Sequence, residues 1–175
     1  VTAACINADP WKRLCRHTDG ANVDLKFMHE KLYREICDGY LLPVLNNLVA
    51  AVAAGVAVEV TNLVIPTLND STGDLRLLCR WIAKNMGPET PLHFSRFFPR
   101  YRLKNLPPTP AATLERARDI AGEAGLKHVY VGNLYMAGAQ DTRCAGCGKV
   151  LVRRTGYRVF ENRVENGRCP ECGRA

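Results

Sequence analysis

Two CxxC pairs near the carboxyl end constrain the fold of this chain more than any other feature. Cys144 and Cys147 form the first pair, and Cys169 and Cys172 form the second, with 21 residues between the pairs. Each turn directs two thiolates to one point, so the two turns together close a tetrahedral four-sulfur site. The spacing predicts zinc, with disulfides or a rubredoxin-like iron site as the alternatives. Because sulfur fills all four positions, we expect a structural ion.

The segment between the two pairs alternates apolar and polar residues, which predicts a β-hairpin and, with the metal, a zinc ribbon. Small residues around Gly138, from Met136 to Gln140, are typical of a short linker. We therefore expect two units, with residues 1–138 forming the larger one and residues 139–175 the zinc ribbon.

The first 135 residues alternate short β-branched runs with amphipathic stretches. The expected strands are 1–4, 21–26, 56–65, 92–97 and 128–133. The expected helices lie near 9–18, 29–38, 43–54, 72–86 and 110–124. Ser71 and Thr109 are predicted helix caps, with Pro110 in the first turn, and Gly55 and Gly125 stand where helices should stop. Repeated strand–helix–strand order predicts a parallel sheet in an α/β fold.

Composition excludes several classes of protein. The chain is 47% hydrophobic and 23% charged, as in ordinary globular proteins. Its longest apolar region, Leu41 to Val60, is broken by polar residues, Pro43 and Gly55, so we expect no membrane span. The first residues lack the pattern of a secretory signal. Cys79 falls on the apolar stripe of a predicted helix, and free buried thiols are typical of a reducing compartment, so we expect a cytoplasmic protein.

The formal net charge is +7, which by itself would suit an acidic partner such as nucleic acid. From Arg143 onward the tail has eight Lys and Arg against three Glu, so it carries most of this excess. A zinc ion with four thiolates has a charge of about −2. This offsets much of the basicity of the tail, and we do not expect nucleic acid to be a partner on that ground.

Polar residues at predicted strand ends are the remaining candidates for a site. Asp24 and Lys26 are two apart at the end of a strand, so their side chains should share one side of the sheet. His93 and Arg96 lie on another predicted strand. In parallel sheets, ligands bind at the carboxyl ends of the strands. The alternative for Asp24 and Lys26 is a surface ion pair of little energetic value.

The order of motifs resembles the later part of a radical SAM enzyme, and more closely the radical SAM member of the AmmeMemoRadiSam system, a relative of the pyruvate formate-lyase activating enzymes. The resemblance covers essentially the whole chain. The matching stretches are "ANVDLK", Tyr33 to Leu45, "VEVTNLVIPTLND", "TPLHFSRFFP", "LPPTP" with "TLERARDIA", "VYVGN" and the two CxxC pairs.

This resemblance implies an incomplete (β/α) barrel that holds a [4Fe-4S] cluster and S-adenosylmethionine, from which a hydrogen-abstracting 5′-deoxyadenosyl radical is made. It implies that Asp24 and Lys26 lie near the methionine and ribose portions of S-adenosylmethionine. The other candidate contacts on matching strands are Thr2, Asn22, His93 and Arg96. His17, His29 and His128 match no motif, and we expect them on the surface.

Three departures from the family pattern accompany the resemblance. The chain has no CxxxCxxC cluster motif and no glycine-glycine-glutamate motif, both of which belong to the first strands of the barrel. Thr2-Ala3-Ala4 stands where relatives have Thr-Asn-Gly. Phe98 stands at the position of a histidine of the activating enzymes. The chain therefore resembles the second half of the barrel, and this fragment alone is expected to be inactive.

Three functional hypotheses follow. The first is the carboxyl-terminal part of a radical SAM enzyme whose partner is the missing first half of the barrel, acting on an unknown substrate. The resemblance further implies Memo-like and AMMECR-like proteins as partners. The second is a zinc-ribbon module that recruits nucleic acid or protein, and the third is a structural remnant without activity.

Overall fold

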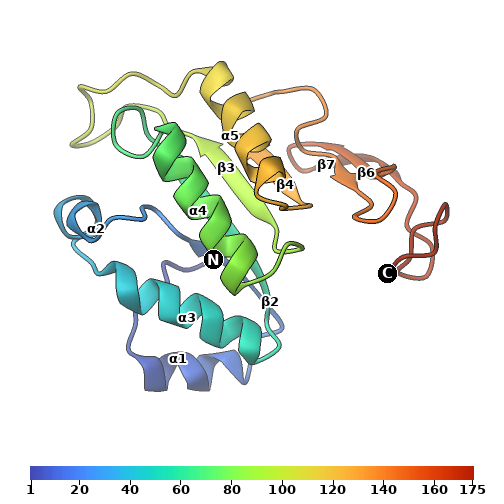
Figure 1. Ribbon diagram of the computed structural model, residues 1–175, viewed down its shortest axis with the longest axis horizontal. Helices are drawn as coiled ribbons and strands as arrows, with labels where there is room; N and C mark the ends of the chain where they lie inside the picture. The colour runs from blue at the N-terminus through green and yellow to red at the C-terminus, as the bar shows by residue number, and fades with distance from the viewer.

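The computed structural model describes residues 1–175 and contains two sheets (Figure 1). The larger sheet has four parallel strands in chain order: β1 (Gly20–Asp24), β2 (Ala57–Val64), β3 (Leu92–Arg96) and β4 (Val129–Gly132). The helices are α1 (Ala8–Cys15), α2 (Glu30–Cys37), α3 (Leu41–Ala53), α4 (Thr72–Asn85) and α5 (Ala111–Glu123). Parallel neighbours need crossover connections, which the helices supply. The predicted α/β class is confirmed.

Helices α3, α4 and α5 cover one face of this sheet, in front of it in Figure 1, while α1 packs on the outside of α3. Each covering helix buries residues three and four apart, which is the stripe that a 3.6-residue period produces. Those of α4 are Leu75, Leu78, Cys79 and Ile82. They belong to the same buried cluster as the strand residues Val23, Val60, Phe94 and Val131, all fully or nearly fully buried. The core therefore lies between the helices and one side of the sheet.

Local signals fixed several boundaries correctly. The Ser71 hydroxyl accepts a hydrogen bond from the backbone N–H of Asp74 at 3.1 Å, so Ser71 caps α4 as predicted. Gly55 and Gly125 follow α3 and α5 with φ of +83° and +90°, where glycine is least strained. The cap predicted at Thr109 is wrong. Pro110 is the N-cap residue of α5, and the Thr109 side chain bonds to other strands instead.

The predicted first strand is also shorter than expected. Residues 1–4 contribute only an isolated parallel bridge between Thr2 and Val23. Ala4 has a φ of +49° and therefore turns the chain away from the sheet. The N–H of Thr2 donates to Asn22 and the N–H of Asp24 donates to Thr2, so this bridge continues the sheet for one residue beyond β1.

The smaller sheet is antiparallel and consists of β5 (Thr142–Arg143), β6 (Val150–Thr155) and β7 (Arg158–Asn162). The β6–β7 hairpin stands between the two CxxC pairs, where the sequence predicts it. The predicted linker packs against the larger sheet, because Ala139 is buried and its carbonyl accepts the N–H of Val131 at 3.0 Å. The division near residue 139 stays a prediction.

None of the five helices is by itself long and apolar enough to cross a membrane. Only α2 and α3 taken together have the length and apolar composition of a membrane span, and the chain bends by 103° between these two helices.

Candidate functional site

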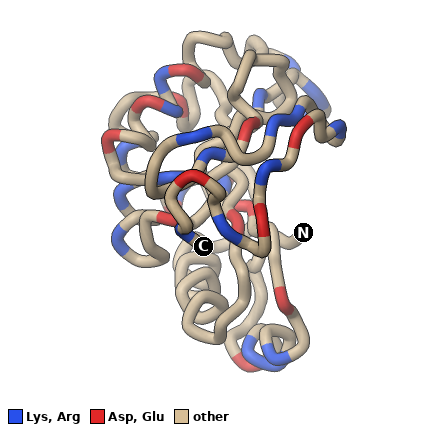
Figure 2. Tube along the Cα trace, turned by 90° about the vertical axis from the view of Figure 1, so that its right-hand side faces the viewer, with Lys and Arg blue, Asp and Glu red and all other residues tan.

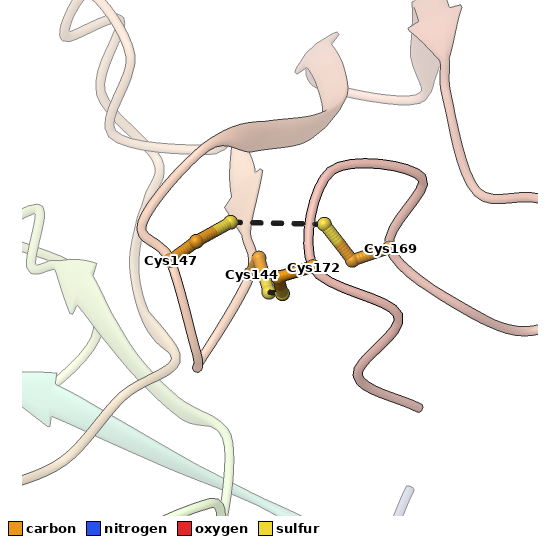
Figure 3. Close-up of side chains that lie close together, drawn as sticks. All are labelled: Cys144, Cys147, Cys169 and Cys172. Carbon is orange, nitrogen blue, oxygen red and sulfur yellow. Dashed lines mark hydrogen bonds between the residues drawn. The ribbon is translucent and has the colours of Figure 1, made fainter.

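The four cysteines of the CxxC pairs converge on one point (Figure 3). All four sulfur atoms lie within 4.8 Å of one another, with 3.5 Å between the Sγ atoms of Cys144 and Cys172 and 3.7 Å between those of Cys147 and Cys169. Four sulfurs around one zinc at about 2.3 Å would stand about 3.8 Å apart. The cluster can therefore hold a metal ion such as zinc.

The two CxxC turns have the same backbone geometry. The N–H of Cys144 donates to Lys149 and that of Gly148 to Cys144, and the second turn repeats both bonds from Cys169 to Arg174 and from Gly173 to Cys169. Gly148 and Gly173 have φ of +73° and +74°, which glycine adopts without strain. The repeated turn points both thiols of each pair inward.

Backbone donors already favour the thiolate form within this cluster. The N–H groups of Cys147 and Gly146 hydrogen-bond to the Cys144 sulfur and lower the pKa of that thiol to about 6. The N–H of Arg174 acts in the same direction on Cys172, but the neighbouring thiols, first of all Cys144, raise the pKa of Cys172 to about 11. Sulfurs this close resist full ionisation without a cation, which is what a metal ion supplies.

The face of the larger sheet opposite the helices is polar. Residues in parallel register share one face, and the pairs Asn22–Glu59, Asp24–Thr61 and Thr61–His93 all fall on this side. Tyr130 is in register with His93 and continues the row onto β4. We call this side of the sheet, with Asn22, Asp24, Glu59, Thr61, His93 and Tyr130, the polar sheet face. It joins residues from all four parallel strands.

Asp24 and Lys26 stand at the carboxyl edge of this face. The Lys26 Nζ lies 2.9 Å from an Asp24 carboxylate oxygen, and both side chains are half-buried. Their backbone is held firmly. Asn62 donates to the carbonyls of Leu25 and Lys26, and Asn69 donates to that of Lys26 at 2.9 Å. The pair is therefore presented by a fixed strand end.

Thr2 and Asn22 lie next to this pair in different ways. The Asn22 Oδ1 accepts a hydrogen bond from the Thr61 hydroxyl at 2.9 Å, which places it on the polar sheet face. The Thr2 hydroxyl accepts the N–H of Ala4 at 3.0 Å, so it serves the local turn, while its backbone pairs with β1. Of these two residues, only Asn22 offers a side chain to the same surface as Asp24.

His93 is level with Asp24 in the register and belongs to a second group on the polar sheet face, which extends through Glu59 toward the amino end of β2. Its Nε2 lies 3.0 Å from the Glu59 carboxylate, and this hydrogen bond lowers the pKa of Glu59. The His93 ring stacks on Tyr130 with 5.0 Å between centroids. Arg154, from the ribbon, lies 4.9 Å from the centre of the Tyr130 ring. The ribbon thus contacts the polar sheet face at Tyr130.

The remaining predicted residues are placed elsewhere. Arg96 is in register with Val64, on the alternate side from His93, and its Nε donates to the Thr109 carbonyl at 2.9 Å. Its guanidinium lies 4.9 Å from the ring of Phe98, which is exposed. The structure does not bring Arg96 to Asp24 and Lys26. His128 is half-buried rather than on the surface, and burial lowers its pKa.

Sequence reasoning missed Glu59, Thr61, Tyr130 and Arg154. The first two carried a usable signal, because Glu59 and Thr61 alternate with buried residues along β2 and so mark a second polar side. Arg154 carried none, since its place depends on how the ribbon packs against β4. No second cluster of three or more metal-ligating side chains exists in the chain.

Comparison with known proteins places this geometry in a known fold. A domain of the pyruvate-formate lyase-activating enzyme of Bacteroides vulgatus aligns with a TM-score of 0.67 at 14% identity, covering 76% of this chain and 80% of that one. A radical SAM methyltransferase of Sphaerobacter thermophilus aligns with a TM-score of 0.59 at 16% identity, covering 79% of this chain and 40% of that one. At such identities the likeness is one of fold.

One curated protein is similar in sequence. The uncharacterized protein MJ0808 of Methanocaldococcus jannaschii is 41% identical over 175 residues, which is 99% of this chain and 52% of MJ0808. The chain thus spans about half the length of the relative it matches. A scan against models of known protein families finds no match.

Proposed function

We propose that the chain is the carboxyl-terminal part of a radical SAM enzyme of the activating-enzyme type, and that it forms the second half of an incomplete barrel. The observation that carries this is the Asp24–Lys26 pair, fixed at the carboxyl edge of a parallel sheet whose free face is polar. The fold likeness and the half-length match to MJ0808 support it. The specific link to the AmmeMemoRadiSam system rests on the sequence motifs.

The residues present fit part of S-adenosylmethionine. Lys26 complements a carboxylate, Asp24 an ammonium group, and the polar side chains of Asn22 and Thr61 can bond hydroxyls beside them. At Gly132 a Cβ would lie 3.1 Å from the Ser95 hydroxyl, so glycine keeps this part of the face free. When bound, S-adenosylmethionine supplies hydrogen-abstracting radical chemistry.

The residues present do not fit a [4Fe-4S] cluster of this kind. Such a cluster needs three suitably placed thiolates with one iron left open. Outside the ribbon, Cys15 and Cys79 are buried while Cys5 and Cys37 are exposed, and no three of them gather. We propose that the missing half supplies the cluster and is the first partner. Memo-like and AMMECR-like proteins are further proposed partners through the system resemblance alone.

In this proposal the ion in the ribbon is zinc, and its role is structural because no ligand position is left open. The competing hypothesis, a ribbon that recruits nucleic acid or protein, has less support. Arg153 pairs with Glu161, Arg163 with Glu171 and Arg174 with Glu89. Basic and acidic segments alternate along the chain in the view of Figure 2, so the ribbon offers no uninterrupted basic stripe.

The test uses this chain co-expressed with the part of MJ0808 that it does not match. S-adenosylmethionine affinity is measured by calorimetry for the parent and for Lys26→Met. We expect a loss of about ten- to hundredfold, since a charge-assisted contact is worth roughly 1.5–3 kcal/mol. Lys31→Met is the matched control, because Lys31 forms an exposed pair with Glu35 on α2.

The melting temperature is followed in the same samples, because a half-exposed ion pair contributes only about 1 kcal/mol or less to stability. Equal affinity in Lys26→Met and in the control would return the pair to the role of a surface salt bridge. The chain alone, after anaerobic reconstitution, should form no 5′-deoxyadenosine. Product above a protein-free blank would refute the proposal that the other half carries the cluster.

A further inference from the structure

The connection between β3 and α5, residues 98–108, is a loop with a closed base. The backbone N–H of Phe97 donates to the Thr109 hydroxyl at 2.8 Å, and the N–H of Thr109 donates to the Phe97 carbonyl at 3.2 Å. The Thr109 hydroxyl in turn donates to the carbonyl of Val64 in β2. Thr109 is fully buried. Loops of this length with joined ends are compact and frequently functional.

One side of this loop packs inward and the other faces solvent. Leu103 and Leu106 are partly buried against the core, and the N–H of Leu103 closes a turn onto Arg100. Four residues on either side of Leu103 are exposed, namely Arg100, Tyr101, Arg102 and Lys104. The inward leucines and the closed base therefore leave the four exposed residues on the solvent side of the loop.

The charge on this outer surface is uncompensated. The chain has no Asp or Glu between Glu89 and Glu115. Arg100, Arg102 and Lys104 form no ion pair, in contrast to the paired arginines of the ribbon. The expectation that nucleic acid is no partner rests on the charge of the tail, where carboxylates and thiolates offset the arginines. The 98–108 loop lies outside the tail and contains neither carboxylates nor thiolates.

Two aromatic rings stand among these cations. The side chain of Tyr101 is 77% exposed, with the Arg102 guanidinium 5.2 Å from its ring centre. Phe98 is 45% exposed, with Arg96 at 4.9 Å. Exposed rings next to unpaired cations are the components with which proteins bind single strands, because bases stack on the rings while cations contact phosphates.

We propose that the 98–108 loop is a docking surface for single-stranded nucleic acid. Arg100, Arg102 and Lys104 contact successive phosphates, and Tyr101 stacks on a base. An acidic peptide would use the same charges but would gain little from the ring, so the exposed Tyr101 favours the nucleic acid. This proposal stands on the loop alone and is independent of the radical SAM assignment.

Fluorescence anisotropy with a labelled single-stranded 12-nucleotide RNA tests the proposal on the full 175-residue chain. Three phosphate contacts give a slope of about −2.1 for log K against log salt concentration. Arg100→Gln/Arg102→Gln should reduce its magnitude by about 1.4. Tyr101→Ala should weaken binding about tenfold and leave the slope unchanged.

Arg13→Gln/Arg16→Gln is the control, because it removes the same charge from exposed, unpaired arginines on α1 and at its C-cap, and α1 lies at the bottom of Figure 1, away from the 98–108 loop at the top. The control should keep the parent slope and affinity. If it loses as much as the loop variant, binding depends on net charge only, and the proposal is overturned. It is also overturned if Tyr101→Ala binds normally while poly-glutamate competes as well as RNA, which would identify an acidic peptide site. All variants are checked for an unchanged melting temperature.

Discussion

Replacing Thr109 by valine removes one hydroxyl and keeps the shape of the side chain. In the native protein that hydroxyl accepts the Phe97 N–H at 2.8 Å and donates to the Val64 carbonyl at 2.6 Å, in a position with no solvent exposure. Valine leaves both backbone groups without this partner. A buried polar group left unsatisfied costs about 1–3 kcal/mol, so for the two groups we expect a loss of about 2–6 kcal/mol in the free energy of unfolding.

Thermal and urea unfolding measure this effect. For a chain of this size each kcal/mol corresponds to about 2–4 °C, so the melting temperature should fall by about 4–24 °C. Thr109→Asn separates this explanation from helix capping, because asparagine is among the best N-cap residues. Asparagine does not fit the fully buried position, and we expect it to destabilise the protein as well. A stable Thr109→Asn variant with a destabilised Thr109→Val variant would show that Thr109 acts as a cap and that our reasoning is wrong.

Two further predictions concern the metal centre and the polar sheet face. Cys169→Ser should lower the metal content, measured by elemental analysis, well below one equivalent. The ribbon should also become sensitive to proteolysis while the parallel sheet stays folded, since metal binding and folding of such sites are coupled. Full retention of zinc would contradict the four-thiolate site. The pKa of Glu59 is lowered by the His93 hydrogen bond, so its stabilising contribution is present above the ordinary pKa of 4.5 and is lost as pH falls through the lower folded value. Stability measured against pH should therefore show a shallower acid loss in Glu59→Gln than in the parent, and identical curves would exclude this contribution.

The sequence predicts the elements of this fold well because their signals are local. Each helix carries its own apolar stripe, and Ser71, Gly55 and Gly125 mark ends through bonds or dihedral angles that need no distant partner. The thiols of the ribbon were predictable for the same reason, since a CxxC turn is a local geometry. Thr109 was misread because its hydroxyl is used by β2 and the end of β3, 45 and 12 residues away.

The candidate site was predictable only in part. Asp24 and Lys26 lie together because they are two apart at the carboxyl end of β1, which stops at Asp24 rather than at the expected residue 26, and their spacing is visible in the sequence. The contacts of His93 with Glu59 and Tyr130 depend on the register of three strands, which no local pattern specifies. The position of Arg96 was predictable from the alternation of side chains along a strand. Arg96 is three positions after His93, and an odd separation puts the two side chains on opposite faces of the sheet.

The packing of Tyr130 between His93 and Arg154 has a practical consequence for anyone who shortens this chain. A truncation at residue 138 follows the composition of the sequence, but it removes the carbonyl of Ala139 that pairs with Val131 and the hydroxyl of Thr142 beside the Tyr130 hydroxyl. The ring, now only 7% exposed, would meet water along with the β4 edge. Unpaired strand edges beside exposed aromatic rings promote self-association. The shortened protein would therefore be a poor substitute for the parallel-sheet part of the chain, and an expression trial that ends there would yield aggregates for reasons unrelated to the site.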